Sequence, residues 1–160
     1  MSLDVFAPAH RIAAQVREGD VTAVAVTEAF LARIAALDPV VNAFTDVTAE
    51  RALTQARAID AARAAGAPLG PLAGVPFAAK NLFDIEGLPT RAGSKINRER
   101  EPATRDAVLV ERLTAAGAVL LGGLNMGEYA YDFTGENAHD GPCRNPHDPA
   151  RMAGGSSSGS

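Results

Sequence analysis

Apolar residues recur at helical spacing in the first quarter of the chain. Ile12 and Val16 lie one turn apart, and Gly19 follows them where a left-handed helix end is expected. Thr22 is predicted to cap a second helix that runs until the Asp-Pro pair at 38–39. The apolar positions of this second helix are Val26, Phe30, Ile34 and Leu37.

The next segments alternate between strand-like and helix-like patterns. Residues 40–47 are strand-like, and Thr48 is predicted to cap an alanine-rich helix over 49–65. Proline and glycine are too dense in 67–76 for regular structure. That loop leads into a predicted strand over 77–84.

A helix, a glycine and a short apolar strand follow one another in the second half. Residues 86–105 are predicted to form a polar, solvated loop. Asp106 is predicted to cap a helix that ends at Gly117, and residues 118–121 form an apolar strand. This unit indicates an α/β fold.

The last third of the sequence is richer in turn residues. Residues 125–131 are predicted to begin a helix, whereas 132–153 show no regular pattern. A structureless stretch of that length inside a compact domain is usually functional.

Composition and charge narrow the class of protein. The 160 residues are 47% apolar and 21% charged, which is typical of one globular domain. The net charge of −4 gives no general attraction to nucleic acid or to an anionic membrane. No apolar run approaches the roughly 18 residues of a membrane span. Cys143 is the single cysteine and no signal segment is visible, so a cytoplasmic location is expected.

The candidate chemistry lies in two stretches. In Gly154–Ser160, three adjacent serines framed by glycines place hydroxyl groups beside unhindered backbone N–H donors, as acyl transfer requires. Such a run is also typical of a flexible linker. Lys80 follows an apolar run, and desolvation there would lower its pKa and let it accept a proton from serine. The commoner alternative is a lysine whose head lies in water.

Four ordered motifs resemble the amidase signature family. They are the Gly-Val-Pro-x-x-x-Lys segment at 74–80, the run at 106–128, the Glu-Asn to Asn-Pro-x-Asp segment at 136–148, and Gly-Gly-Ser-Ser at 154–157. The resemblance implies a mixed β-sheet core flanked by helices, of which only the N-terminal part is present. It places 1–160 in a single amidase domain, with 1–65 as a helical layer and 66–160 as the start of the signature core.

The resemblance also implies a Ser-Ser-Lys triad that cleaves amides through an acyl-enzyme, without metal or organic cofactor. Lys80 corresponds to the general base, and Ser156 to the serine in a cis peptide that relays the proton. In the family the nucleophilic serine lies in a later segment, so we expect it beyond residue 160 and expect this chain alone to be inactive. The predicted substrate-binding residues are Tyr131, Gly154 and Gly155.

Within the family, residues 125–139 resemble members that act on small carbamoylated ureas together with a small helical companion subunit. The A subunit of aminoacyl-tRNA amidotransferases shares much of the same framework and is the second candidate. A small-molecule amide substrate is expected in either case, and a homo-oligomer is possible. A truncated, non-catalytic module that binds a partner through residues 1–65 is the alternative of another class.

Two other nucleophiles fit the sequence less well. Gly155–Gly159 matches the nucleophile-elbow pattern around Ser157, but that motif needs a preceding strand and a later histidine. The histidines all lie upstream, and none has metal-ligand spacing with a third candidate. Cys143 could act with Lys80 and Glu128 in an amidase of a different fold, although a lone cysteine is more often a small buried apolar residue.

Overall fold

The computed structural model describes residues 3–160, which form two compact units linked by several chain crossings. The first unit contains the chain up to Ile34, Thr48–Phe77 and Glu111–Leu121. The second contains Ala35–Val47, Ala78–Val110 and Gly122–Ser160. Every residue of the predicted catalytic site belongs to the second unit.

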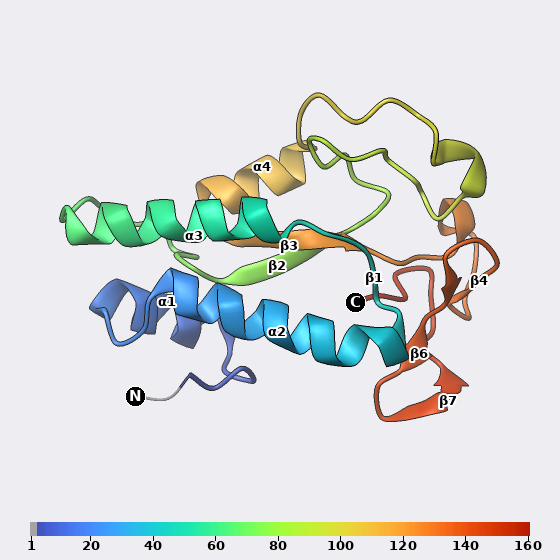
Figure 1. Ribbon diagram of the computed structural model, residues 1–160, viewed down its shortest axis with the longest axis horizontal. Helices are drawn as coiled ribbons and strands as arrows, with labels where there is room; N and C mark the ends of the chain where they lie inside the picture. The colour runs from blue at the N-terminus through green and yellow to red at the C-terminus, as the bar shows by residue number, and fades with distance from the viewer. Residues whose placement is uncertain (1–2) are drawn as a thin grey trace. The chain divides into compact units, whose positions relative to one another are not determined.

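A three-stranded sheet has the order β1-β3-β2, with β1 at Phe44–Val47, β2 at Pro76–Lys80 and β3 at Val119–Leu124 (Figure 1). Strand β1 pairs antiparallel with β3. The N–H of Val119 donates to Val75 O at the start of β3, and Asn81 N–H donates to Leu124 O at its end. The pairing advances along both chains, so β2 and β3 run parallel. The predicted α/β class with a mixed sheet is therefore confirmed.

Strand β3 is longer than the predicted 118–121 and is buried throughout. The extension crosses Gly122, which has φ +156° and pairs with Val47 of β1. A Cβ atom at Gly122 would lie 2.0 Å from the carbonyl oxygen of Asp46. Only glycine lets β1 approach β3 this closely, and β1 itself is shorter than the predicted 40–47.

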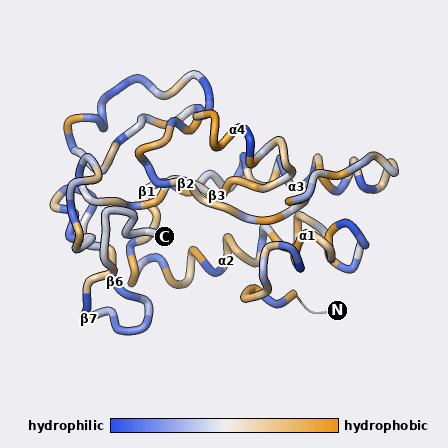
Figure 2. The backbone as a smooth tube through the Cα atoms, turned by 180° about the vertical axis from the view of Figure 1, so that it is seen from behind, coloured by the Kyte–Doolittle hydropathy of each residue, from blue (hydrophilic) through white to orange (hydrophobic). Residues whose placement is uncertain are grey.

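The α-helices are α1 (Ala9–Glu18), α2 (Ala23–Val41), α3 (Ala49–Ala64) and α4 (Val108–Ala115). Hydrophobic and hydrophilic positions alternate along them in Figure 2. In the first unit Val16, Val26 and Leu120 are among the fully buried side chains. Gly19 ends α1 in the left-handed conformation and its N–H donates to Val16 O, as predicted.

The start of α2 is capped twice. The hydroxyl of Thr22 accepts the Ala25 N–H at 3.0 Å, which confirms the predicted cap. The carboxylate of Asp60, from α3, accepts the N–H groups of Ala23 and Val24 at 2.8 and 3.0 Å. Three backbone donors of the first turn are therefore satisfied.

The predicted end of α2 at Asp38-Pro39 is wrong, because the helix continues through Pro39 to Val41. Asp38 Oδ1 accepts the N–H groups of Ala43 and Phe44 just beyond the helix. These bonds stabilise the chain reversal after α2.

Thr48 is the N-cap residue of α3, as predicted, but the side-chain cap expected from it is not formed. Its side chain makes no capping bond to α3, and its hydroxyl donates to Leu120 O instead. Thr48 N–H donates to Leu121 O, and Gln55 Oε1 accepts the Leu120 N–H. Thr48 and the first turns of α3 therefore satisfy the hydrogen-bonding groups of β3 in the part of the strand that β1 does not reach.

Side-chain hydrogen bonds replace regular elements in much of the second unit. The predicted helix over 125–131 is only a single 3₁₀ turn, Glu128–Ala130, in which Tyr129 and Ala130 have positive φ. The stretch 132–153 is not structureless, because it holds two short hairpins. Their strands are β4 Glu136–Asn137, β5 Gly141–Pro142, β6 Arg144–Asn145 and β7 Asp148–Met152.

Two further expectations for this unit need correction. Strand β2 ends at Lys80 and not at Asp84, because Asn81 N–H makes the last bond to β3 and a turn follows. The loop 86–105 is not merely solvated, since it contains a 3₁₀ turn at Lys95–Asn97 with Ser94 and Asn97 buried.

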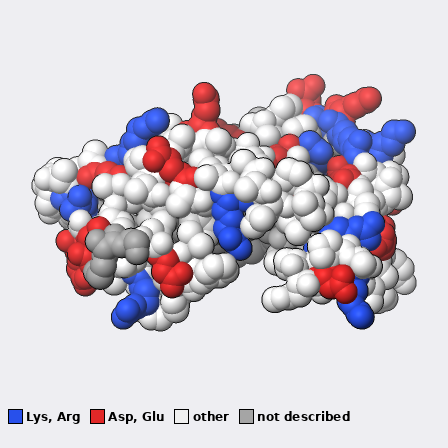
Figure 3. Space-filling view, turned by 60° about the horizontal axis from the view of Figure 1, so that its bottom comes forward, with Lys and Arg blue, Asp and Glu red and all other residues white. Residues whose placement is uncertain are grey.

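Charged side chains of both signs are interspersed on the face shown in Figure 3. None of the helices described between residues 3 and 160 is long and apolar enough to cross a membrane. The same residues hold no cluster of three or more side chains suited to a metal ion.

We predict that Asp60→Asn lowers the free energy of unfolding by about 1–2 kcal/mol, because an amide can accept only one of the two N–H groups that begin α2. Urea unfolding of the purified protein measures the change. Asp20→Asn, at an exposed position before the same helix, is the control and should leave the midpoint unchanged. Equal midpoints for the two variants would contradict the capping role.

Candidate active site

Lys80 and Ser156 lie in hydrogen-bond contact although 76 positions separate them. Lys80 is the last residue of β2, and Ser156 lies in the glycine-rich loop after β7. The distance from Lys80 Nζ to Ser156 Oγ is 2.7 Å. The structure thus brings together the two side chains to which the sequence assigned catalysis.

The environment of Lys80 disfavours its charged form relative to that of an exposed lysine. Its side chain is half-buried at the end of a strand whose preceding residue, Ala79, is buried. Desolvation by burial lowers the pKa of Lys80 below its ordinary value. The lysine can therefore exchange a proton with the serine hydroxyl more readily than an exposed lysine could.

The backbone around Ser156 is held at several points. The peptide bond between Gly155 and Ser156 is cis. Ser156 O accepts the Gly127 N–H at 3.0 Å, and the N–H of Gly154 donates to Thr134 O at 3.1 Å. Gly154 itself has φ +91°, a conformation suited to glycine.

Asp132 is a site residue that the sequence reasoning missed. Its Oδ1 accepts both the N–H and the hydroxyl of Thr134, and its Oδ2 accepts the Gly135 N–H at 2.7 Å. These hydrogen bonds lower the pKa of Asp132, and the bond from the Thr134 hydroxyl is the largest cause. An Asp two residues before Thr is a known turn signal, but nothing local shows that this turn contacts the Ser156 loop.

Asn137 was also missed, and it satisfies four backbone groups. Its Nδ2 donates to Gly93 O and Met126 O, both at 2.7 Å. Its Oδ1 accepts the N–H groups of His139 and Asp140. The side chain is buried and joins three loops.

Asn81, next to Lys80, plays a similar part. Its buried side chain donates to Thr45 Oγ1 on β1 and accepts the Gly93 N–H at 3.0 Å. Its backbone carbonyl accepts the Ala92 N–H. These bonds hold Asn81, and with it the end of β2 at Lys80, between β1 and the turn at 92–93.

Cys143 is poorly suited to the alternative role of nucleophile. Burial raises the pKa of its thiol, so the reactive thiolate is disfavoured. Its Sγ donates to the carbonyl oxygen of Ser158. Glu128, the proposed companion, contacts Ser94 Oγ and His139 Nε2, and the bond from Ser94 is the main cause of its lowered pKa.

Tyr131, predicted to bind substrate, is 92% exposed and projects from the loop just before Asp132. Gly154 and Gly155, predicted for the same role, form the backbone that leads into Ser156. A Cβ at Gly155 would lie 2.8 Å from Asp132 O, so this position has no room for a side chain.

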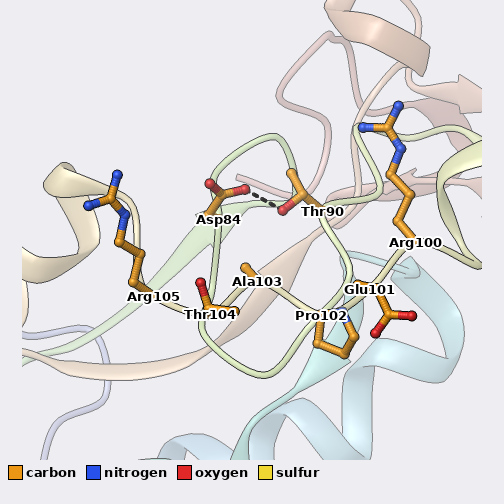
Figure 4. Close-up of a pocket in the computed structure, with 8 residues that line it drawn as sticks. All are labelled: Asp84, Thr90, Arg100, Glu101, Pro102, Ala103, Thr104 and Arg105. Carbon is orange, nitrogen blue, oxygen red and sulfur yellow. Dashed lines mark hydrogen bonds between the residues drawn. The ribbon is translucent and has the colours of Figure 1, made fainter.

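A cavity of about 370 Å³ lies beside the serine loop and is lined in part by Cys143, Ser158 and Ser160. A second hollow, of about 340 Å³, lies in the exposed loops that follow β2 (Figure 4). Arg100 and Arg105 extend from its rim, and the Thr90 hydroxyl donates to Asp84 in its lining. Neither Lys80 nor Ser156 lines either space.

The motifs and this geometry agree with comparisons to known proteins. The chain belongs to the amidase family, whose model, described as Amidase, matches residues 25–160. A curated relative is AtzE, the 1-carboxybiuret hydrolase subunit of Pseudomonas sp. (strain ADP), 63% identical over 145 residues that cover 91% of this chain and 32% of that protein. The A subunit of the glutamyl-tRNA(Gln) amidotransferase of Streptomyces avermitilis is 52% identical, covering 95% of this chain and 30% of that protein.

Solved structures give the same result. One, described as a vestigial protein complex that reveals the evolutionary origins of an s-triazine catabolic enzyme, matches with a TM-score of 0.95 and 60% identity. It covers 96% of this chain and 34% of that one. A 6-aminohexanoate cyclic dimer hydrolase complexed with substrate has a TM-score of 0.88 and 32% identity, covering 99% and 31% of the two chains. The chain thus spans about a third of the length of these relatives.

We predict that Asn137→Ala destabilises the protein by on the order of 3 kcal/mol, because it leaves four backbone groups without their partner, two of them buried. Asn145→Ala is the matched control, since its Oδ1 accepts a single N–H, from His147. Its cost should stay within about 1 kcal/mol. Denaturant unfolding measures both variants, and equal costs would show that Asn137 does not hold the loops together.

Proposed function

We propose that residues 1–160 are the N-terminal part of a single amidase domain, with 1–65 as a helical layer and 66–160 as the start of the signature core. The domain belongs to an amidohydrolase that cleaves linear C–N amide bonds. The family match over 25–160 and the coverage of about a third of each relative support this assignment.

In the proposed mechanism, neutral Lys80 accepts the proton of Ser156 Oγ while Ser156 accepts the proton of a nucleophilic serine beyond residue 160. That serine attacks the amide carbon and forms a tetrahedral intermediate. The C–N bond then breaks, the proton returns through Ser156 to the leaving nitrogen, and water hydrolyses the acyl-enzyme. The observation that carries this proposal is the 2.7 Å contact between Lys80 Nζ and Ser156 Oγ.

The substrate we propose is a small carbamoylated urea, because the chain is 63% identical to a protein of 1-carboxybiuret hydrolase. A cytoplasmic location and a small helical companion subunit are also part of the proposal; the relative is named as a subunit and a similar solved structure as a protein complex, which supports association with another chain. The A subunit of a glutamyl-tRNA(Gln) amidotransferase is the second candidate, supported by 52% identity. Tyr131, Gly154 and Gly155 remain our candidates for substrate contact in either case.

For the full-length protein, Lys80→Ala should lower kcat/KM by about 10²- to 10⁴-fold and leave the fold intact, because it removes the proton acceptor. Lys80→Arg should be equally inactive, since guanidinium does not deprotonate. The matched control is Lys95→Ala, which changes the only other lysine of the sequence, at an exposed position. Ammonia release measures activity, and near-normal turnover of Lys80→Ala would refute the assignment.

The pH dependence follows from the neutral form of Lys80 being the active one. Activity should rise with pH as the lysine loses its proton, and then level off. Because desolvation lowers its pKa, the midpoint should lie below that of an ordinary lysine. A pH profile of kcat/KM tests this, and a profile that falls over the same range would assign the lysine a cationic role.

The extent and the substrate of the enzyme can be tested together. The intact mass of the natural polypeptide should be about three times that of residues 1–160, given the coverage of its relatives. The full-length protein should then release ammonia from 1-carboxybiuret faster than from glutamine. The reverse preference would favour the amidotransferase, whereas a natural mass of about 16.5 kDa would favour the non-catalytic binding module.

A further inference from the structure

Both carboxylate oxygens of Asp132 are used within its own turn. Oδ1 accepts the Thr134 N–H at 3.0 Å and the Thr134 hydroxyl at 2.7 Å, and Oδ2 accepts the Gly135 N–H at 2.7 Å. The carboxylate is thereby fixed in one orientation, because each oxygen has at least one donor directed at it.

Two glycines border Asp132. A Cβ at Gly127 would lie 2.5 Å from Asp132 Cβ, and one at Gly155 would lie 3.2 Å from Asp132 Oδ2. Neither glycine can be replaced without displacing Asp132 or its own backbone. Asp132 therefore packs directly against two backbone segments that come from different loops.

Both of these segments hold Ser156. Gly155 precedes it across the peptide bond, and the N–H of Gly127 donates to its carbonyl oxygen at 3.0 Å. The turn made by Asp132 adds a third contact to the same loop, since Thr134 O accepts the Gly154 N–H at 3.1 Å. The backbone of Ser156 is thus flanked by Gly155 and Gly127, and both glycines lie against Asp132.

We propose that Asp132 is a positioning residue that sets the Ser156 hydroxyl at bonding distance from Lys80 through the backbones of Gly127 and Gly155. This inference rests on the proposed function, because it assumes that Ser156 relays the proton. Asp132 acts through geometry, because both of its carboxylate oxygens are used within its own turn.

The negative charge of Asp132 matters only because a carboxylate has two acceptor atoms. In Asp132→Asn, one oxygen can still accept from Thr134, but an amide nitrogen faces the Gly135 N–H, and neither group can accept. Asp132→Ala removes both acceptors. The two variants should therefore displace Ser156 to increasing degrees.

The test uses the full-length enzyme with its carbamoylated substrate and compares Asp132→Asn and Asp132→Ala with the wild type. We expect kcat to fall about 10-fold or more for Asn and on the order of 100-fold for Ala, because small misplacements of a catalytic group have effects of this size. KM and the midpoint of the alkaline rise in activity should be unchanged. Asp148→Asn is the matched control, as Asp148 accepts the Ala150 N–H in a similar turn and is exposed.

Each outcome separates this inference from the proposed function. Activity that persists in Lys80→Ala, measured in the same assay, would refute the function itself. With Lys80→Ala inactive, unchanged kcat in Asp132→Asn would overturn the positioning role alone. A rise in KM at constant kcat would make Asp132 a substrate ligand. A shifted midpoint of the pH profile would make it an electrostatic partner of Lys80. Either result would overturn the inference.

A folding defect is detected independently of activity. Amide hydrogen exchange at Gly135 and Gly154 should become faster in Asp132→Asn, whereas Lys80→Ala should leave exchange there unchanged. Unchanged exchange at both amides in Asp132→Asn would show that Asp132 does not hold the loop. If Asp132→Ala fails to fold, the Asn variant carries the test.

Discussion

The hydrogen bond between Lys80 Nζ and Ser156 Oγ is the contact on which the proposed chemistry depends, and neither residue can reach the other by local structure alone. Lys80 has a fixed place because β2 pairs in parallel with the buried strand β3 as far as Asn81. Ser156 has a fixed place because its loop is hydrogen-bonded to Gly127 and Thr134. The site therefore joins a rigid strand to a loop that carries little regular structure of its own.

The loops around the site are ordered in large part by polar side chains. Asn81, Asn137 and Asp132 each accept backbone N–H groups, and the two asparagines also donate to backbone or side-chain oxygens. Such residues offer an irregular chain the hydrogen bonds that a helix or sheet would otherwise provide. Loss of the asparagines is costly because some of the groups they satisfy, at Gly93 and Met126, are buried.

The sequence was most informative where structure is local or a motif is long. The helix ended by Gly19 and the cap at Thr22 could be predicted from residues close together in the chain. The family followed from four long motifs, and the mixed sheet followed from the resemblance to that family. Errors arose where distant segments compete for the same group, as when the hydroxyl of Thr48 bonds to β3 and not to its own helix. Asp132 escaped notice for the same reason, since its neighbour Gly155 lies 23 positions away.

Strand β2 is the last strand on its side of the sheet within residues 3–160, and it begins with a proline, which is typical of edge strands. An edge strand presents backbone donors and acceptors to any further strand that can align with them. A strand that joined there would run about 4.8 Å from the backbone that carries Lys80. The sheet can thus be widened at the side where Lys80 stands, and a segment remote in sequence could reach the proposed site by becoming its next strand.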